Sequence, residues 1–384
     1  MLKTVSEQNS TILIYPSAHV YSALLTMVTA LKRRWRPFIA LLLGGTTLLV
    51  LHTAFRGEPI IVSEKTWVDF PVKYSSSGSS SLTTSCTLKP SEDSQFLKVD
   101  LRVIVITYGR PQSLLRLLRS LDAANYDRDS VLIEVWIDRS SWGQVSNETL
   151  AAALGFRFKK GACHVHVHSV HVGISGQWLT TWNPASDTGE IAVIFEDDLT
   201  VSPYFYKYLK LVHNTYGRRS DVSGFSLQGI SLRHSDGKCC VNVPFENKVF
   251  LYPTLGTSGF SPNRVNWFNF QSWLKRIRDK GLQAPLINDH ISVKWYKELK
   301  RQSEGESMWE LEYIYYTQMQ KEYTLYPNFN GHRGLAMNWF EYGLHTAGQM
   351  EKSAIYELLA DWSPEYEDLP TVPIYVNNNG DIIH

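Results

Sequence analysis

The chain has 384 residues, enough for two or three domains at about 150 residues each. Lys and Arg number 38 against 37 Asp and Glu, a formal net charge of +1, which excludes a nucleic-acid binder that relies on bulk charge. With 43% hydrophobic and 20% charged residues, a chain disordered over its whole length is also excluded, and a globular domain with a large core is predicted. The cysteines are too few for a disulfide scaffold and lack the C-x-x-C spacing of a zinc site. They are Cys86, Cys163, Cys239 and Cys240.

A basic N-terminus precedes an uncharged apolar stretch. Residues 1–36 contain five basic residues and one acidic residue, whereas residues 37–55 contain none of either kind and approach the ~20 residues that span a bilayer. The positive-inside rule then predicts a cytoplasmic tail over 1–36, a transmembrane signal-anchor over 37–55 and type II topology. A cleaved signal peptide is the alternative, but its apolar core usually has only ~7–15 residues. Residues 11–31 are also rather apolar, and Pro16 and His19 favour a cytoplasmic or interfacial segment there.

The segment that follows the predicted anchor has no helical or strand periodicity. Residues 56–98 include a Ser-rich run over 75–81, which is typical of a flexible stem. A globular domain is predicted over 99–345 and a C-terminal extension over 346–384. An anchor, a stem and a long globular segment suit a Golgi enzyme, although a surface receptor would use them too. Asn147 opens an N-x-Thr sequon and is a predicted glycosylation site if this segment is luminal.

The globular segment alternates apolar strands with helical patterns. The first strand is predicted over Leu101–Thr107, and Pro111 opens a helix with leucines at helical spacing. Further strands are predicted over 131–138, 164–170 and 191–195. This alternation predicts an open α/β sheet in which ligands bind beyond the carboxyl ends of the strands.

Polar or charged residues follow three of these strands, over 107–110, 138–141 and 196–198. The carboxylates of Glu196, Asp197 and Asp198 repel one another, which is tolerable where a divalent cation lies between them and a bound phosphate. Hard oxygen ligands suit Mg²⁺ or Mn²⁺, and such an ion stabilises charge on a departing nucleoside diphosphate. The alternative is a solvated acidic turn. The position at the end of the fourth strand favours the metal.

Residues 101–330 resemble the GT-A nucleotide-sugar transferases, with the nearest likeness to the N-acetylglucosaminyltransferase I type of Golgi enzyme. The resemblance rests on the first strand with Thr107 and Arg110, VWID ending at Asp138, GISGQWLTTW over 173–182 and VIFEDDLTVSPYFYKYL over 193–209. It implies an α/β fold of GT-A type, a Rossmann-like, mostly parallel sheet flanked by helices, in the lumen behind an N-terminal transmembrane helix.

The resemblance also implies roles for individual residues. Asp198 would bind Mn²⁺, and the other residues would contact the nucleotide-sugar: Glu196 and Asp197 near the sugar and ribose, Asp138 at the uracil, Thr107 and Arg110 near the nucleotide. Residues 255–260 match the family's donor-site loop loosely, and the glycines there allow close backbone approach.

Inverting transfer needs a carboxylate base for the acceptor hydroxyl. The family places an Asp after a Trp in a W-D-D motif, and this chain departs from it with Trp309-Glu310-Leu311-Glu312. By position Glu310 is the candidate base, and Glu312 and Asp289 are rivals. An amphipathic helix face is the alternative, because aromatic residues recur there at helical spacing.

Histidines and cysteines give weaker signals. His164, His166 and His168 alternate with valines, and this pattern is interpreted as a half-exposed strand rather than a zinc site. His332 and His345 are interpreted as ordinary surface or core residues. Cys239 and Cys240 could pair with Cys86 or Cys163 in an oxidising lumen, and the connectivity stays open.

The sequence therefore predicts a single-pass type II Golgi membrane protein whose luminal domain transfers a sugar from a UDP-sugar to a glycan or glycoprotein acceptor. Mn²⁺ is the expected cofactor, GlcNAc the favoured sugar and inversion the expected outcome, with no nucleic-acid partner. The second hypothesis is a catalytically silent protein of the same fold that binds glycans or partner enzymes as a scaffold. A luminal sulfotransferase is disfavoured, because no G-x-x-x-x-G-K-[ST] motif is present.

Overall fold

The computed structural model describes residues 84–89, 99–184, 189–229, 232–288, 290–302, 308–341, 351–352 and 357–383. The predicted cytoplasmic tail and membrane anchor lie outside these ranges, and so do Asp289 and His345. Over the described ranges, no helix combines the length and the apolar character needed to cross a membrane.

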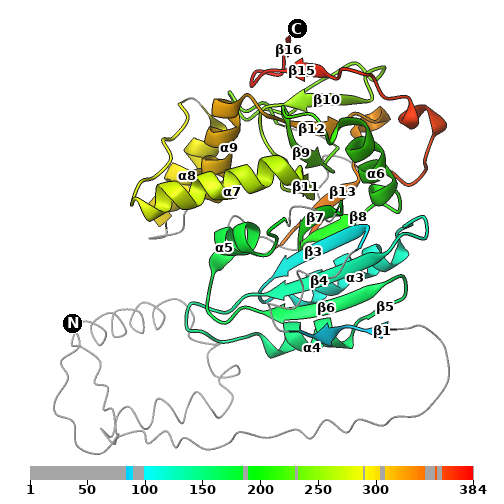
Figure 1. The fold of residues 1–384 in the computed structure, drawn as a ribbon, viewed down its shortest axis with the longest axis vertical. Coiled ribbons are helices and arrows are strands. Elements are labelled where there is room, and N and C mark those ends of the chain that lie inside the picture. Colours follow the sequence, from blue (N-terminus) through cyan, green and yellow to red (C-terminus); the bar gives the residue numbers. More distant parts are fainter. Residues whose placement is uncertain are drawn as a thin grey trace, which may run out of the picture. The chain divides into compact units, whose positions relative to one another are not determined.

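The described elements alternate between strands and helices for much of the chain (Figure 1). The strands are β1 (Thr84–Ser85), β2 (Thr87–Leu88), β3 (Leu101–Thr107), β4 (Val131–Ile137), β5 (Arg157–Phe158), β6 (Ala162–Val167), β7 (Ile191–Glu196), β8 (Leu199–Val201), β9 (Val222–Ser226), β10 (Val249–Tyr252), β11 (Phe260–Pro262), β12 (Tyr323–Pro327), β13 (Ala336–Phe340), β14 (Glu351–Lys352), β15 (Ile374–Val376) and β16 (Ile382–Ile383). The helices are α3 (Pro111–Ala123), α4 (Asn147–Gly155), α5 (Gly173–Thr180), α6 (Phe205–Tyr216), α7 (Arg264–Asp279), α8 (Ile291–Gln302) and α9 (Trp309–Gln320), with 3₁₀ turns η3 (Asn330–His332) and η4 (Pro364–Glu367).

One large mixed sheet organises these elements, in the order β16-β15-β10-β12-β9-β11-β7-β3-β4-β6-β2. The predicted strands correspond to β3, β4, β6 and β7, which lie side by side and pair in parallel. The prediction of an α/β fold with a mostly parallel sheet is therefore confirmed. Beyond β7 the sheet continues through β11, which runs antiparallel to both β7 and β9.

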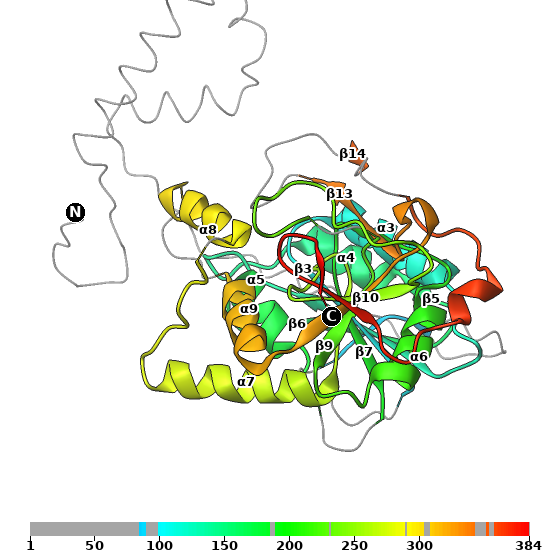
Figure 2. The same ribbon diagram turned by 90° about the horizontal axis from the view of Figure 1, so that it is seen from above.

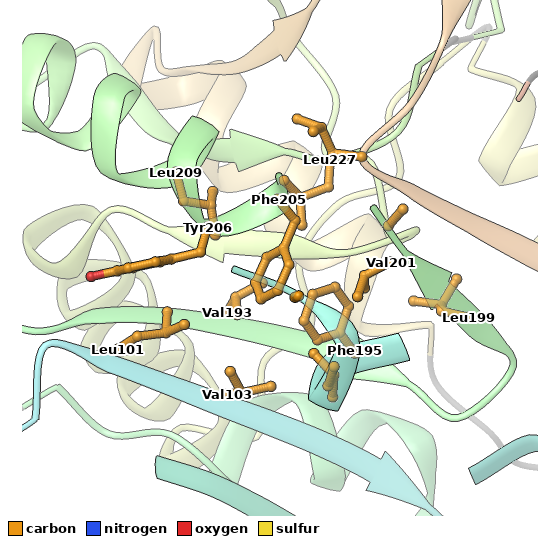
Figure 3. Packing of buried hydrophobic residues seen from close by; sticks show 14 of the residues in the cluster. Leu101, Val103, Val193, Phe195, Leu199, Val201, Phe205, Tyr206, Leu209 and Leu227 are labelled. Carbon is orange, nitrogen blue, oxygen red and sulfur yellow. The ribbon is translucent and has the colours of Figure 1, made fainter. Parts of the chain in front are cut away.

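Helices cover both faces of this sheet, and alternate residues of β3 point to opposite cores. Leu101, Val103 and Val105 pack with the leucines of α3 and with α6 on one face. Ile104 and Ile106 pack on the other face with tryptophans of α5, α7 and α9. Figure 2 shows α7 and α9 on one side of the molecule and α3 and α6 on the other. Figure 3 shows Phe195 of β7 and Phe205 of α6 in the core on the α3 and α6 face, where their rings form an edge contact.

The fourth parallel strand in sheet order, β6, differs from its prediction. Its histidines were expected on a half-exposed strand, but His166 is fully buried and His164 and His168 are each 8% exposed. The half-exposed interpretation is wrong for a physical reason: β6 is not an edge strand. It lies between β4 and β2, and Trp136 stacks on His166 with ring centroids 4.4 Å apart.

The disulfides in the structure differ from the suggested pairing of Cys239 or Cys240 with Cys86 or Cys163. Cys86 bonds to Cys163 at the start of β6, and Cys239 bonds to Cys240. The first bond fastens residues 84–88, which fall within the predicted stem, to β6. Within this segment, β2 pairs with β6 and forms one edge of the large sheet. Strands β15 and β16, which fall within the predicted C-terminal extension, form the opposite edge.

The predicted glycosylation residue lies on the surface. Asn147 is exposed at the first position of α4. Ser146 caps this helix, because the Ser146 hydroxyl accepts a hydrogen bond from the Thr149 N–H at 3.2 Å. The local structure leaves the Asn147 side chain accessible to a modifying enzyme.

Candidate active site

Parallel pairing places the carboxyl ends of β3, β4 and β7 at one edge of the sheet. Ile106 pairs with Glu196, and Thr107 pairs with Ile137. The residues that follow these strands are therefore neighbours in space, although they are separated by up to about 90 positions in the chain. This edge is the candidate active site.

Thr107, Arg110 and Asp197 form its buried base. The Thr107 hydroxyl donates to Asp197 Oδ2 at 2.5 Å, and the Arg110 guanidinium forms an ion pair with Asp197 Oδ1. Arg110 also donates to Asp198 Oδ2 at 3.2 Å, so one cation bridges two carboxylates. Burial raises the pKa of Asp197 to about 6 despite the opposing effect of Arg110. The position of Arg110 follows from Pro111, which starts α3 immediately after it.

Glu196 connects the strand end to α5 and α9. The indole N–H of Trp178, on α5, donates to Glu196 Oε1 at 3.0 Å. Trp178 stacks on Trp309, the first residue of α9, with centroids 4.9 Å apart and planes at 26°. Burial raises the pKa of Glu196 to about 8, and the nearby carboxylates of Asp198 and Glu310 add to the increase. The tryptophan stack therefore brings Glu310 close to the acidic strand end.

The two glutamates of the W-E-L-E segment lie in different surroundings. Burial raises the pKa of Glu310 to about 7. Glu312 instead forms an ion pair with Arg278 of α7 at 2.5 Å. Residues two apart on a helix point in nearly opposite directions, so only Glu310 can face Glu196. The other rival, Asp289, lies outside the described residues.

Asp138 follows β4 and is fully engaged with the backbone. Its two carboxylate oxygens accept hydrogen bonds from the N–H groups of Val172 at 3.0 Å and Gly173 at 2.9 Å, where α5 begins. His171 Nδ1 lies 3.1 Å from Asp138 Oδ2. These contacts hold α5, which in turn carries Trp178 to Glu196. Asp138 thus positions the helix, and the predicted contact with uracil stays a prediction.

Sequence reasoning missed Glu341, which follows β13. Its carboxylate accepts hydrogen bonds from Ser113 and Arg116 of α3. The pKa of Asp198 is raised by burial, and the negative charge of Glu341 adds to this effect while Arg110 opposes it. No local motif signals Glu341, because its position depends on the pairing of β13 with β8, including the hydrogen bond from the Trp339 N–H to the Asp198 carbonyl at 2.8 Å.

The loop over residues 255–260 runs beside the acidic strand end. Phe260 pairs antiparallel with Ile194, so the preceding residues run toward Glu196. Gly259 has a φ of +82°, and a Cβ there would come 2.8 Å from the Phe195 ring. Only glycine fits this close approach. The structure therefore places the predicted donor loop at the predicted site.

The donor set fits a hard divalent cation. The carboxylates of Glu196, Asp197 and Asp198 lie around the guanidinium of Arg110, and Glu310 lies near Glu196. Burial raises the pKa of all four, and neighbouring negative charges add to the increase for Glu196, Asp197 and Asp198. Carboxylate oxygens are the ligands that Mg²⁺ and Mn²⁺ prefer. His332, by contrast, packs in η3 with its ring 5.4 Å from that of Phe245.

Comparisons with known proteins show only distant likenesses. No family model matches the sequence, and no curated protein matches it. Among solved structures, the chain is similar to residues 1–349 of TarS from S. aureus, with 13% identity over 60% of each chain and a TM-score of 0.34. The TarS fragment in complex with UDP-GlcNAc gives 12% identity and a TM-score of 0.33, over 60% of this chain and 58% of that one. The mannosyltransferase PcManGT from Pyrobaculum calidifontis, in complex with GDP-Man and Mn²⁺, gives 14% identity and a TM-score of 0.30, over 71% of this chain and 76% of that one. These scores are too low to assign a family.

Proposed function

We propose that this chain is a GT-A glycosyltransferase that transfers a sugar, with GlcNAc favoured, from a UDP-sugar to a glycan or glycoprotein acceptor. One observation carries the proposal: buried and partly buried carboxylates crowd the carboxyl end of β7, and the stack of Trp178 on Trp309 brings Glu310 to them. A chain that only had to fold would gain stability by losing this repulsion. The resemblance of the surrounding motifs to the N-acetylglucosaminyltransferase I type supports the choice of donor.

Asp198 is the residue proposed to hold Mn²⁺, since it is less buried than Asp197 and contacts Arg110 at only one oxygen. When bound, the ion stabilises negative charge on the departing diphosphate. Arg110 is placed to exchange its contact with Asp198 for a phosphate oxygen. Thr107 and Arg110 keep Asp197 fixed beneath the site, where it orients the donor.

Glu310 is the proposed general base. A carboxylate whose pKa lies near 7 can accept a proton from an acceptor hydroxyl more readily than an ordinary glutamate with a pKa of 4.5. Inverting transfer requires a base on the face opposite the leaving diphosphate, and Glu310 on α9 is the residue proposed to act there.

A type II Golgi membrane protein with a luminal catalytic domain is the proposed setting. The uncharged stretch over 37–55 supports the anchor. The Cys86–Cys163 disulfide and the exposed Asn147 sequon are features of domains in an oxidising, glycosylating compartment.

The test is UDP release by the purified full-length chain in detergent from a panel of UDP-sugars, with Mn²⁺ or with a chelator, and with mixed glycan acceptors. We expect release from one donor, with Mn²⁺ only, and none from the Asp198→Asn variant. UDP binding without release from any donor or acceptor would favour the silent scaffold. Release that persists in chelator or in Asp198→Asn would overturn the metal assignment.

A further inference from the structure

A second polar cluster lies on the face of the sheet that α5 covers. It is farther from the carboxyl ends of the strands than the candidate active site is. Glu134 of β4 and His164 and His166 of β6 each present one ligand-type atom, and these atoms lie within 4.8 Å of one another. The strand register produces this arrangement, because Glu134 pairs with His164 and Trp136 pairs with His166. Two neighbouring strands of a continuous sheet therefore hold the three side chains in fixed positions.

Both imidazoles are buried, and three of their four ring nitrogens have no hydrogen-bond partner among the described residues. His166 is fully buried, and within the described part of the chain neither of its ring nitrogens has a hydrogen-bond partner; Nδ1 of His164 has none either. His166 Nε2 lies 3.7 Å from Glu134 Oε1, too far for a hydrogen bond. Leaving a buried polar group unpaired is destabilising, so these nitrogens point to a ligand that would bind them.

The carboxylate of the cluster is held in place by its neighbours. Arg102 donates to Glu134 Oε1 at 3.0 Å and to both oxygens of Glu190 at 3.1 Å. Arg102 therefore orients Glu134, while Glu190 balances the positive charge of the guanidinium.

We propose that Glu134, His164 and His166 bind a divalent transition-metal ion of the zinc class. Two imidazole nitrogens and one carboxylate oxygen match the ligand preference of Zn²⁺, whereas Mg²⁺, Ca²⁺ and Mn²⁺ prefer oxygen ligands alone. The ion links β4 to β6 near the place where the Cys86–Cys163 disulfide fastens the adjoining β2. Its role is to stabilise this edge of the sheet.

This zinc site is separate from the proposed Mn²⁺ site. Glu134 pairs with Ile104, which pairs with Ile194, two residues before Glu196. Two inter-strand spacings separate β4 from β7, about 10 Å. The inference therefore does not depend on the proposed transferase activity, and either can fail alone.

The test uses the purified full-length chain in detergent, stripped with a chelator and dialysed. Zn²⁺ is titrated by calorimetry, and bound zinc per chain is measured by mass spectrometry. We expect one tight site in the unmodified protein and a rise in its melting temperature on adding Zn²⁺. His164→Ala and His166→Ala should weaken binding by more than the ~10–100-fold typical of losing an outer-shell partner.

His168→Ala is the matched control, because His168 lies on the same side of the same chain segment, is equally as exposed as His164 and is not one of the three ligands. We expect His168→Ala and Asp198→Asn to bind zinc as the unmodified protein does. If His166→Ala does not fold, the more exposed His164→Ala and the isosteric Glu134→Gln decide the question. Undiminished zinc in the variants of the three ligands, or no zinc bound at micromolar Zn²⁺ by the unmodified protein, would overturn the proposal.

Discussion

The ends of β4 and β7 both carry aspartate, yet the two ends differ in how their charge is compensated. Asp138 after β4 is paired with two backbone N–H groups at the start of α5. After β7, Asp197 and Asp198 share Arg110, while Glu196 lies beside further carboxylates. The first arrangement is satisfied within the chain, and the second keeps an excess of negative charge.

This difference separates a structural carboxylate from a functional one. A paired Asp stabilises the fold through hydrogen bonds to charged groups. Crowded buried carboxylates destabilise it, and they are useful only where a cation or a proton is to be bound. Substitutions at the two strand ends should therefore have opposite effects on stability and on activity.

The largest expected effect is on turnover in Asp198→Asn. Removing a metal ligand forfeits charge stabilisation of several kcal/mol in the transition state, so we expect kcat/KM to fall by about 1000-fold in Mn²⁺. The melting temperature of the metal-free protein should stay the same or rise, because one repelling charge is gone. Steady-state kinetics and thermal unfolding of the same preparation check both parts. A fall in melting temperature with intact turnover would show that Asp198 stabilises the fold, as Asp138 does at the end of β4.

Glu310→Gln should reduce kcat next most strongly, by about 10²–10⁴-fold, the usual contribution of a general base. Donor binding should persist, because the amide keeps the size of the side chain. The matched control is Glu312→Gln, which breaks only the ion pair with the half-exposed Arg278 and should leave turnover intact. If instead Glu312→Gln is inactive and Glu310→Gln active, the base has been assigned to the wrong side of α9.

The metal-free protein should lose stability as the pH rises from about 6.5 to about 8, above the range in which the buried His213, His234 and His290, with pKa values lowered to about 3, 3 and 4, act in the opposite direction. Glu196, with a pKa of about 8, and Glu310, with a pKa of about 7, hold protons more tightly in the folded state than at their ordinary value of 4.5. In this window the folded state binds more protons than the unfolded state, so the free energy of unfolding falls as the pH rises. Melting temperatures across this range check the trend, and Glu196→Gln should flatten it. A melting temperature that rises through the window would show that these carboxylates are ionised and compensated.

The smallest expected effect is that of Asp138→Asn on stability. Asparagine keeps one acceptor oxygen of the two, so we expect a loss of about 1–2 kcal/mol in the free energy of unfolding. Urea unfolding measures this loss, and UDP affinity measured in parallel tests the predicted contact with uracil. Unchanged stability with reduced UDP affinity would reverse the structural role given to Asp138.

Much of the parallel half of the sheet could be predicted from sequence, because β3, β4 and β7 are mainly apolar runs, interrupted only by Arg102 in β3 and Glu134 in β4, that end in polar residues. The acidic strand end could be predicted for the same reason, and Glu310 by its place after Trp309. These signals are local: each lies within one strand and the turn that follows it.

What sequence did not predict depends on long-range pairing. Glu341 contributes to the site only because β13 pairs with β8. The strands β15 and β16 have too few residues for a periodic pattern, and β10, which pairs with β15, precedes it by more than 100 positions. The histidines of β6 were misjudged because alternation alone does not show that β2 covers the edge.

The central claim is that the end of β7 binds a nucleotide through a divalent cation, and UDP binding measures it most directly. Calorimetric titration of UDP into the full-length chain, with Mn²⁺ or with chelator, should show binding that requires Mn²⁺ and disappears in Asp198→Asn but not in Glu312→Gln. Equal UDP affinity with and without Mn²⁺, or no binding in either condition, would contradict the account.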